Sequence, residues 1–554
     1  MPTGAELFAS SVVKLGIDTI FTLVGDHLNE VLLALSQAGV RIIDQRHESG
    51  VTHAADGWAR VHRKPALTLV TGGPGHTNSL TGIATAHLNG SPLIAVSGTA
   101  STVFAGRQVF QVMDQAGMAA PSTKWSADAV NPSHIPYLLG RAYNEANSGR
   151  KGVVHLSIPV NVFASSTETS LPMPPARPQP TLAPSREEVE QAIGTLFQAE
   201  RPVVIAGSGV WWGEAERELE QFLKVTRLPL FTVTMARGVI SDHARNVFGY
   251  ADPAINRGCL PAFQEADVVL LLGKRLDYRL AMGGPRLFSP SAKIIQVDLH
   301  APELGAARPV AQGICAGVKA TLEAMRELAG TKPWTPLDKW TRKLRKYATE
   351  SQAALNKLGE DRSSPMHPAA VFATLREALP KDTLYAWDGG DFVHWGRAMI
   401  PATQRGGWLR LGPMGTIGSA LPICISLQMA NPGKPVVMIT GDGSLGFYLA
   451  ELETLVRYKL PVVIIVGNDG GWGLERELQR ELTGNETVAC ELQQTRYDII
   501  MKGFGGDGET VERVQDLAPA VKRAFSAGKP YLLNLVIRGS RSPFTEWQIA
   551  GKKK

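Results

Sequence analysis

The sequence predicts an α/β protein made of three doubly wound domains, each built on a parallel sheet. A chain of 554 residues is long enough for about three domains, each with its own core. Short apolar runs recur along the chain and end in glycine or an acid, as buried parallel strands do. Two stretches that suit neither strands nor a packed core separate three blocks. These observations together predict α/β layers in every block.

The two linkers set the expected domain boundaries. Residues 171–184 are dense in proline and cannot form a regular helix or a central strand, so we expect a first domain to close near residue 165. A charged stretch between about 330 and 367 can be helical as far as Leu358, before Ser363-Ser364-Pro365 ends it. The predicted segments are domains at 1–165, 183–330 and 367–540, followed by a tail or lid at 541–554.

The central block shows strand-like runs at 202–209, 267–273 and 293–298, which predict a Rossmann-like domain. The first run ends in Gly207-Ser208-Gly209. This short motif alone is too weak to choose between ADP, FAD and no ligand on that domain.

The third block carries a motif with chemical meaning. An apolar run at 436–440 predicts a buried strand that delivers Gly441-Asp442-Gly443 at its end, where open parallel sheets place ligands. Apolar residues at helical spacing predict a helix over 445–458, and a second strand at 461–466 leads to Asn468. Mg²⁺ prefers oxygen ligands, and Asp442, the Asn468 amide oxygen and a carbonyl near Gly470 can supply them. The glycines allow backbone amides to approach a diphosphate at the start of the helix.

Composition excludes several classes of protein. The formal charge of +6, from 57 basic and 51 acidic residues, is too mild to predict a nucleic-acid partner. The four cysteines are isolated, without disulfide or metal-ligand spacing, which fits a reducing cytoplasm. We expect no secretion leader and no membrane-spanning segment, because no apolar run is long enough.

The motif order resembles that of a known superfamily. Gly441-Asp442-Gly443 followed by Asn468 is similar to the diphosphate motif of thiamine diphosphate enzymes in the acetolactate synthase, pyruvate decarboxylase and 2-hydroxyacyl-CoA lyase group. Arg46-His47-Glu48 resembles the family segment with the activating glutamate, and 72–78 resembles its glycine-rich loop. Phe110-Gln111 and Thr123-Lys124-Trp125 match further segments in order, so the resemblance covers nearly the whole chain.

The resemblance implies a pyrimidine-binding first domain, a central Rossmann-like domain and a diphosphate-binding third domain. In the family, an acid bonded to the aminopyrimidine ring turns a neighbouring amino group into an internal base, and Glu48 is expected to play that part. Met414 matches the apolar residue that bends the cofactor. The expected cofactor-binding residues are Glu48, Pro74, Asn78, Gly390, Asp391, Phe392, Met414, Gly441, Asp442, Gly443, Ser444, Asn468, Gly470, Gly471 and Trp472. Asp442, Asn468 and Gly470 are the expected Mg²⁺ ligands.

Three more residues are expected on the substrate side. Asp26 resembles a pyruvate decarboxylase residue, and His27 resembles benzaldehyde lyase; either can shuttle a proton. Asp26 can alternatively cap a helix over 28–36. Gln111 matches a family glutamine near the substrate.

The reaction is expected to be 2-hydroxyacyl-CoA cleavage. Residues 388–393, 466–472 and 485–490 resemble 2-hydroxyacyl-CoA lyases, which form formyl-CoA and an aldehyde or ketone and catalyse the reverse condensation. Lys274 or Arg275 is a candidate contact for the CoA nucleotide.

Two alternatives stay open. An acetolactate synthase would join 2-oxo acids and carry FAD on the central domain; residues 275–279 partly resemble its flavin segment, but 473–480 lack its glutamine-tryptophan-acid segment. The second alternative is an inactive regulatory paralogue that binds the cofactor. In relatives the active site lies between subunits, which implies a homodimer or homotetramer.

Overall fold

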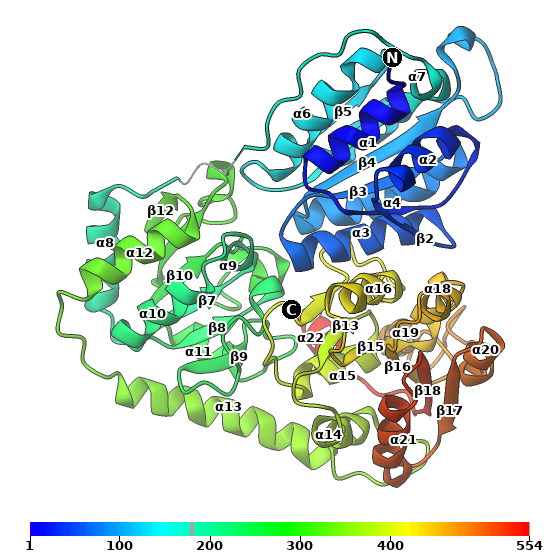
Figure 1. The fold of residues 1–554 in the computed structure, drawn as a ribbon. Coiled ribbons are helices and arrows are strands. Elements are labelled where there is room, and N and C mark those ends of the chain that lie inside the picture. The colour runs from blue at the N-terminus through cyan, green and yellow to red at the C-terminus, as the bar shows by residue number, and fades with distance from the viewer. Residues whose placement is uncertain (178–181, 553–554) are drawn as a thin grey trace. The chain divides into compact units, whose positions relative to one another are not determined.

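The computed structural model describes residues 1–177 and 182–552, and within them the chain forms three six-stranded sheets (Figure 1). Neighbouring strands are parallel in all three sheets. The predicted α/β fold with three doubly wound parallel sheets is therefore confirmed. Residues 178–181 of the predicted linker and 553–554 of the predicted tail lie outside the described residues.

The first sheet has the strand order β2-β1-β3-β4-β6-β5. Its strands are β1 Thr19–Thr22, β2 Arg41–Asp44, β3 Ala66–Val70, β4 Leu93–Thr99, β5 Trp125–Asp128 and β6 Val153–Pro159. Its helices are α1 Gly4–Lys14, α2 Asn29–Gln37, α3 Glu48–His62, α4 Pro74–Asn89, α5 Gln115–Ala119, α6 Ile135–Asn147 and α7 Val160–Ala164.

Both faces of this sheet are covered by apolar cores. Successive strand residues point to opposite faces. Ile20 accordingly belongs to the core beneath α1, α2 and α6, whereas Phe21 belongs to the core beneath α3 and α4. This two-sided burial explains why the central strand β3, Ala66–Val70, is fully buried and almost wholly apolar instead of alternating with polar residues.

The second sheet has the order β12-β11-β10-β7-β8-β9. Its strands are β7 Pro202–Ala206, β8 Leu230–Thr232, β9 Val247–Tyr250, β10 Val268–Leu272, β11 Lys293–Asp298 and β12 Gln312–Cys315, and its helices are α8 Arg186–Phe197, α9 Ser208–Trp212, α10 Glu216–Thr226, α11 Cys259–Glu265 and α12 Val318–Ala329. The long helix α13 Asp338–Leu358 follows, which confirms the predicted helical stretch as far as Leu358.

The third sheet has the order β14-β13-β15-β16-β18-β17. Its strands are β13 Leu384–Trp387, β14 Trp408–Arg410, β15 Val436–Gly441, β16 Val463–Asn468, β17 Asp507–Val511 and β18 Tyr531–Val536. Its helices are α14 Pro368–Ala378, α15 Asp391–Met399, α16 Ala420–Ala430, α17 Asp442–Leu445, α18 Glu451–Arg457, α19 Gly473–Thr483, α20 Tyr497–Gly503, α21 Val514–Ser526 and α22 Pro543–Lys552.

Two details near the predicted metal motif differ from expectation. The predicted helix over 445–458 is broken, because residues 446–448 form a separate 3-10 turn between α17 and α18. The second strand ends at Asn468, as predicted, but it begins at Val463 instead of Pro461.

Contacts divide the chain into two compact units. The first holds residues 1–179 together with 411–433 and 445–462, and the second holds 180–410, 434–444 and 463–554. Helices α16 and α18 thus pack with the first sheet although they come from the last third of the chain. The domain boundaries given above remain predictions.

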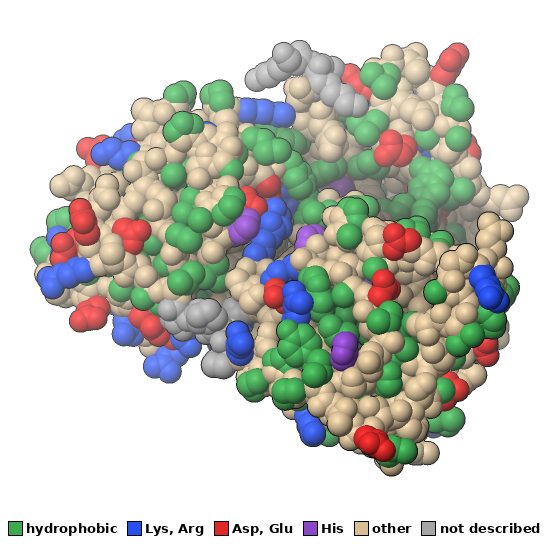
Figure 2. Space-filling model, turned by 90° about the horizontal axis from the view of Figure 1, so that it is seen from above, with side chains coloured by type: hydrophobic (Ala, Val, Ile, Leu, Met, Phe, Trp, Pro, Cys, Tyr) green, Lys and Arg blue, Asp and Glu red, His purple; other side chains and the backbone are tan. Residues whose placement is uncertain are grey.

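The surface agrees with the modest net charge. Figure 2 shows basic and acidic side chains scattered over one face, without a field of a single sign. Among the helices described, none combines the length and the apolar character needed to cross a membrane.

The α3 helix contains a buried ion pair that should control the stability of the first unit. Arg60 lies 2.9 Å from the Asp56 carboxylate, with side-chain exposures of 2% and 0%, and Asp56 also accepts hydrogen bonds from Asn89 and Ser91. We expect Asp56→Ala to destabilise the protein by about 3–5 kcal/mol, because it leaves a buried charge uncompensated. Urea denaturation followed by circular dichroism measures the effect. The control is Glu190→Ala, which removes the exposed pair with Arg186 and should cost about 0–1 kcal/mol; equal effects would contradict the prediction.

Candidate active site

The start of helix α3 presents Glu48. His47 precedes the helix with an extended backbone, and its Nδ1 accepts a hydrogen bond from the Ser49 N–H at 3.1 Å, which fixes Glu48 as the first helical residue. The Glu48 side chain is partly buried, and its Oε2 accepts a hydrogen bond from Asn78 Nδ2 at 3.0 Å. Two residues expected at the cofactor, 30 positions apart, therefore meet directly.

The glycine-rich loop leads into helix α4. Pro74 is the first helical residue, where a missing N–H costs nothing. Gly73 has φ +61°, and a β-carbon there would lie 2.9 Å from the Gln111 side chain, so Gln111 covers the loop. Gln115, which sequence reasoning missed, accepts from the Gly73 N–H at 3.0 Å and donates to the Gly98 carbonyl at 3.0 Å. An isolated neutral residue outside any motif gave no signal of this anchoring role.

His27 is held in one tautomer beside the same loop. Its Nδ1 accepts from the Gly72 N–H at 3.2 Å and lies 2.9 Å from the Thr71 hydroxyl. Burial lowers the pKa of His27, so the ring is neutral and carries its proton on Nε2. Asp26 is exposed at the start of a 3-10 turn. Helix α2 begins at Asn29 without any side-chain cap, so the alternative that Asp26 caps this helix is wrong.

Met414 lies on a sharply turned loop of the first unit. Gly412 and Gly415 on either side have φ +83° and +74°, a region that favours glycine. The Gly412 backbone also packs against the Asn89 side chain, which leaves no room for a β-carbon. The Met414 side chain is 47% exposed within the chain, as a residue that contacts a ligand would be.

The ends of strands β15 and β16 bring Asp442 and Asn468 together. Gly441 pairs with Gly467 in the parallel register, so the next residues, Asp442 and Asn468, stand side by side at the carboxyl edge of the sheet. Asn468 Nδ2 donates to Asn534 Oδ1 at 3.1 Å, and Asn468 Oδ1 accepts from the Gly470 N–H at 3.2 Å. The amide is thereby oriented with its oxygen toward the loop that follows.

Asp442 is an acid that a cation would stabilise. It is 2% exposed, and burial, followed by the neighbouring Asp469, raises its pKa to about 7. Its Oδ2 accepts from the Gly471 N–H at 3.0 Å. Asp442, the Asn468 oxygen and the Gly470 carbonyl are oxygen donors of the kind that Mg²⁺ prefers, so their chemistry fits the expected metal. The Gly470 carbonyl also accepts hydrogen bonds from the Leu492 N–H at 2.7 Å and from Arg476 at 3.2 Å, with which Mg²⁺ would compete. Among the described residues, no cluster of three or more His, Cys, Asp or Glu side chains is placed to hold a metal.

The turn after β15 depends on close backbone packing. A β-carbon at Gly443 would lie 2.6 Å from the Trp472 ring, so the indole covers the turn that carries Gly441 and Ser444. Residues 490–492 form a short ladder with the metal loop: the Trp472 N–H donates to the Cys490 carbonyl at 2.8 Å, and the Leu492 N–H donates to the Gly470 carbonyl at 2.7 Å. This packing leaves a small, backbone-lined turn, which suits a diphosphate.

Three residues at the start of helix α15 differ in their roles: Gly390, Asp391 and Phe392. Gly390, with φ +94°, turns the chain into helix α15. Phe392 is buried and packs over Gly467, where no β-carbon would fit. The Asp391 side chain points to the C-terminal segment, where its Oδ1 accepts hydrogen bonds from Ser542 and Thr545. Burial raises the pKa of Asp391 to about 6.

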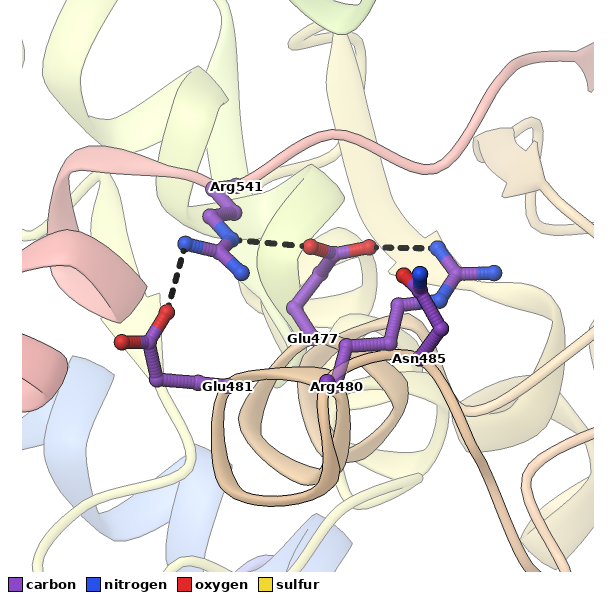
Figure 3. A pocket seen from close by; sticks show the side chains of 6 residues that line it. Glu477, Arg480, Glu481, Asn485 and Arg541 are labelled. Atoms are coloured by element: carbon purple, nitrogen blue, oxygen red, sulfur yellow. Dashed lines mark hydrogen bonds and ion pairs between the residues drawn. The ribbon is translucent and has the colours of Figure 1, made fainter.

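The C-terminal segment is docked within the second unit. Arg541 donates to Glu477 at 2.9 Å and to Glu481 at 3.0 Å, both on α19, which begins directly after Trp472 (Figure 3). These residues border a polar pocket of about 740 Å³, lined by Glu477, Arg480, Glu481, Gly484, Asn485 and Arg541. Beyond it, residues 543–552 form helix α22, whose role as a lid remains a prediction.

A buried group of arginines in the second unit escaped sequence reasoning. Arg279 pairs with Asp252 at 2.9 Å, and Arg397 donates to the Tyr250 hydroxyl at 2.9 Å, with Arg410 at 3.5 Å from the same oxygen. Burial opposes ionisation of Tyr250, but the three arginines outweigh it and lower its pKa to about 7. The residues come from four separate segments, so no spacing in the sequence could reveal the cluster.

The basic residues expected at a CoA nucleotide already have partners. Lys274 is buried against Asp277, and Arg275 lies 3.4 Å from Glu303. A β-carbon at Gly209 would lie 2.5 Å from the Gly273 Cα, so the turns after β7 and β10 touch each other. A nucleotide at this edge of the central sheet would have to compete with these contacts.

The expected site residues thus form two assemblies. The first unit holds Asp26, His27, Glu48, Pro74, Asn78, Gln111 and Met414. The second unit holds Gly390, Asp391, Phe392, Gly441, Asp442, Gly443, Ser444, Asn468, Gly470, Gly471 and Trp472.

Three family models match the chain in the order that the fold suggests. The thiamine pyrophosphate enzyme N-terminal TPP binding domain matches residues 2–118, the central domain matches 189–325, and the C-terminal TPP binding domain matches 388–535. The protein is therefore a three-domain α/β enzyme that uses thiamine pyrophosphate, also called thiamine diphosphate.

Full-length relatives agree with these matches. The chain is 35% identical to the acetolactate synthase large subunit IlvG of Mycobacterium tuberculosis, over 96% of this chain and 95% of the relative. It is 28% identical to human 2-hydroxyacyl-CoA lyase 1, over 97% and 94%, and 28% identical to oxalyl-CoA decarboxylase of Escherichia coli K12, over 97% and 95%. The chain belongs to the thiamine pyrophosphate enzyme family and acts on carbon–carbon bonds.

The Asp391 carboxyl should make docking of α22 depend on pH. Its pKa of about 6 lies above the ordinary 3.8, so the docked state holds the proton more tightly. Docking should weaken as the pH rises from about 4 to about 6 and stay constant above that, by up to about 3 kcal/mol. At pH 7.5 we expect Asp391→Asn to slow amide hydrogen exchange in residues 543–552. Ser542→Ala, which removes a donor, should speed it; identical exchange in wild type and Asp391→Asn would contradict the prediction.

Proposed function

We propose that the protein is a thiamine diphosphate- and Mg²⁺-dependent carbon–carbon lyase and ligase whose first candidate substrate is a 2-hydroxyacyl-CoA. The products are formyl-CoA and an aldehyde or ketone, and the reverse condensation uses the same site. The observation that supports the chemistry most directly is the pairing of Glu48 with Asn78 at the start of α3. When bound, the cofactor supplies a carbon nucleophile and a sink for the electron pair released on bond cleavage.

Glu48 is the acid that activates the cofactor. Its carboxyl group hydrogen-bonds the aminopyrimidine ring, and Asn78 holds its Oε2 so that Oε1 stays available. Pro74 and Met414 line the same cofactor, Met414 from a loop that two left-handed glycines bend outward. The hydrogen bond from Asn78 on α4 fixes the acid at the start of α3.

His27 handles the substrate proton. Its Nδ1 is occupied by the Gly72 N–H, so the proton that it can donate is on Nε2. Asp26 and Gln111 complete the substrate side: Asp26 is exposed beside His27, and Gln111 covers Gly73.

Asp442, the Asn468 oxygen and the Gly470 carbonyl would hold Mg²⁺, and the metal would supply positive charge for the diphosphate. The diphosphate turn is shaped by Gly441, Gly443, Ser444, Gly471 and Trp472. Gly390, Asp391 and Phe392 support it from α15, where Phe392 packs on the strand that ends at Asn468.

The CoA substrate is favoured by the segments around the metal loop. Residues 466–472 and 485–490 resemble 2-hydroxyacyl-CoA lyases, and the strand of residues 490–492 is hydrogen-bonded to that loop. Several full-length relatives are named for reactions of acyl-CoA thioesters. Against a contact from Lys274 or Arg275 to the CoA nucleotide stand their ion pairs with Asp277 and Glu303.

An acetolactate synthase-like reaction on 2-oxo acids is the second candidate. The relatives at 35% identity carry that name. The arginines around Tyr250 would also suit a small carboxylate. In that case FAD on the central domain becomes the cofactor to look for. The inactive-paralogue alternative is disfavoured because Glu48, Asp442 and Asn468 are all present.

We place the enzyme in the cytoplasm as a homodimer or homotetramer. None of the four cysteines forms a disulfide within the described residues, which suits a reducing compartment. In a dimer, Glu48 of one subunit would serve the cofactor held by Asp442 of the other.

Replacing the activating acid should separate binding from turnover. Glu48→Gln keeps the shape of the side chain but cannot share a proton with the ring. We expect turnover to fall at least about a hundredfold while calorimetric binding of thiamine diphosphate and Mg²⁺ persists. Glu30→Gln, an exposed acid of the same domain, is the control. Near-normal turnover of Glu48→Gln would exclude the assigned role.

Product analysis decides between the two substrates. The purified protein with thiamine diphosphate and Mg²⁺ is offered a 2-hydroxyacyl-CoA in one tube and pyruvate, with and without FAD, in another. Formyl-CoA with a carbonyl product is the expected result. Acetolactate without CoA cleavage would support the synthase, and cofactor binding without either product would support the inactive paralogue. A chelator should abolish whichever product forms.

A further inference from the structure

The turn that presents Glu48 is clamped by residues that lie some four hundred positions later in the chain. The Ser49 hydroxyl lies 2.8 Å from the Tyr448 hydroxyl. The Arg46 N–H donates to Glu451 Oε1 at 3.1 Å. Tyr448 and Glu451 thus contact the residues on both sides of Glu48, which suggests a role in holding it.

Glu451 is the more deeply buried of these two residues. It is 1% exposed on helix α18, and its second oxygen accepts the Thr454 hydroxyl at 2.7 Å. A β-carbon at Gly50 would lie 2.6 Å from Glu451 Oε1 and 3.3 Å from Gln45 Oε1. Gly50 has ordinary helical geometry, so glycine is needed there for space alone. The first turn of α3 therefore rests directly on the Glu451 carboxylate.

The Gln45 side chain, just before the turn, adds no hydrogen bond to it. It is 1% exposed, and neither of its amide atoms has a hydrogen-bond partner among the residues that the structure describes. The carboxylate of Glu451 faces the N-terminus of a 15-residue helix, where a negative group is favoured. Its hydrogen bond from the Arg46 N–H therefore adds a polar anchor to the cap that His47 forms within the turn.

We infer that Glu451, assisted by Tyr448, is a positioning residue that sets the placement of Glu48. The inference rests on the proposed role of Glu48. Misplacing a catalytic group by about 1 Å can cost about a hundredfold in rate. Residues 445–458 follow Gly441-Asp442-Gly443-Ser444 directly in the chain, so one short stretch of backbone joins the diphosphate turn to the clamp on the acid.

The test measures cofactor activation directly. The rate of hydrogen–deuterium exchange at C2 of bound thiamine diphosphate, followed by quench and NMR, is compared with kcat and KM. We expect Glu451→Ala to lower the exchange rate and kcat together by about a hundredfold, with KM nearly unchanged. Glu451→Gln, which keeps an acceptor oxygen, should lose less, and Tyr448→Phe less again. Gly50→Ala should act like Glu451→Ala, because the added methyl displaces the carboxylate.

A double substitution distinguishes positioning from a general structural effect. In a Glu48→Gln background, Glu451→Ala should cause no further loss, since the group it positions is gone. The matched control is Glu453→Ala on the same helix, whose carboxylate pairs with Arg457 at 2.9 Å and is 4.0 Å from Arg46; it should behave like wild type. If Glu451→Ala does not fold, the same comparison is made with Gly50→Ala, once in the wild-type protein and once in Glu48→Gln.

Two results would overturn the inference. One is a wild-type exchange rate in Glu451→Ala or Gly50→Ala. The other is a further loss of activity when either substitution is added to Glu48→Gln, as large as the loss that the substitution causes in the wild-type protein. A wild-type exchange rate in Glu48→Gln alone would instead remove the proposed function of Glu48, so the two failures can be told apart.

Discussion

Parallel strand pairing is the constraint on which the C-terminal site depends. Parallel neighbours place their carboxyl ends at one edge of a sheet, so side chains that follow different strands meet there. The register Gly441 to Gly467 sets Asp442 beside Asn468. The same pairing forces both strands to be buried on two faces, which is why a carboxylate at the end of β15 is almost fully withdrawn from water. A cation at that edge would offset the cost of burying the charge.

Close backbone approach is the second recurring device. At Gly443 the indole of Trp472 occupies the place of a β-carbon, and at Gly50 the carboxylate of Glu451 does so. In both cases a glycine lets a side chain from a distant segment touch the backbone of a turn. Glycine costs conformational entropy in a helix, by about 1 kcal/mol relative to alanine, and that cost at Gly50 is difficult to explain by the stability of α3 alone. A requirement for contact with Glu451 explains it.

The sequence revealed the strands well because their apolar runs are continuous and bounded by glycine or acid. It also revealed which polar residues follow β15 and β16. It could not reveal that α16 packs on α3, where Ser426 donates to the Ala54 carbonyl at 2.6 Å and Ile423 lies against Gly57. Periodicity shows that a helix is buried but not which partner buries it. The same limit hid Gln115 and the arginines around Tyr250, since their meaning arises only from contacts between remote segments.

The charge balance of the arginine cluster bears on the substrate. Arg279 and Arg397 approach the Asp252 carboxylate, and Arg397 and Arg410 approach the Tyr250 hydroxyl. Buried positive charges are costly without such partners, so the carboxylate and the phenol stabilise the cluster. His394, whose pKa burial and these arginines lower well below 6.5, stays neutral and supplies no counter-charge. Its ring lies 4.1 Å from Phe544 of α22, so the C-terminal helix covers this side of the cluster. An anionic group of the substrate that bound here would be attracted by the arginines and would lie beside α22, so substrate charge and the position of the C-terminal helix would be linked.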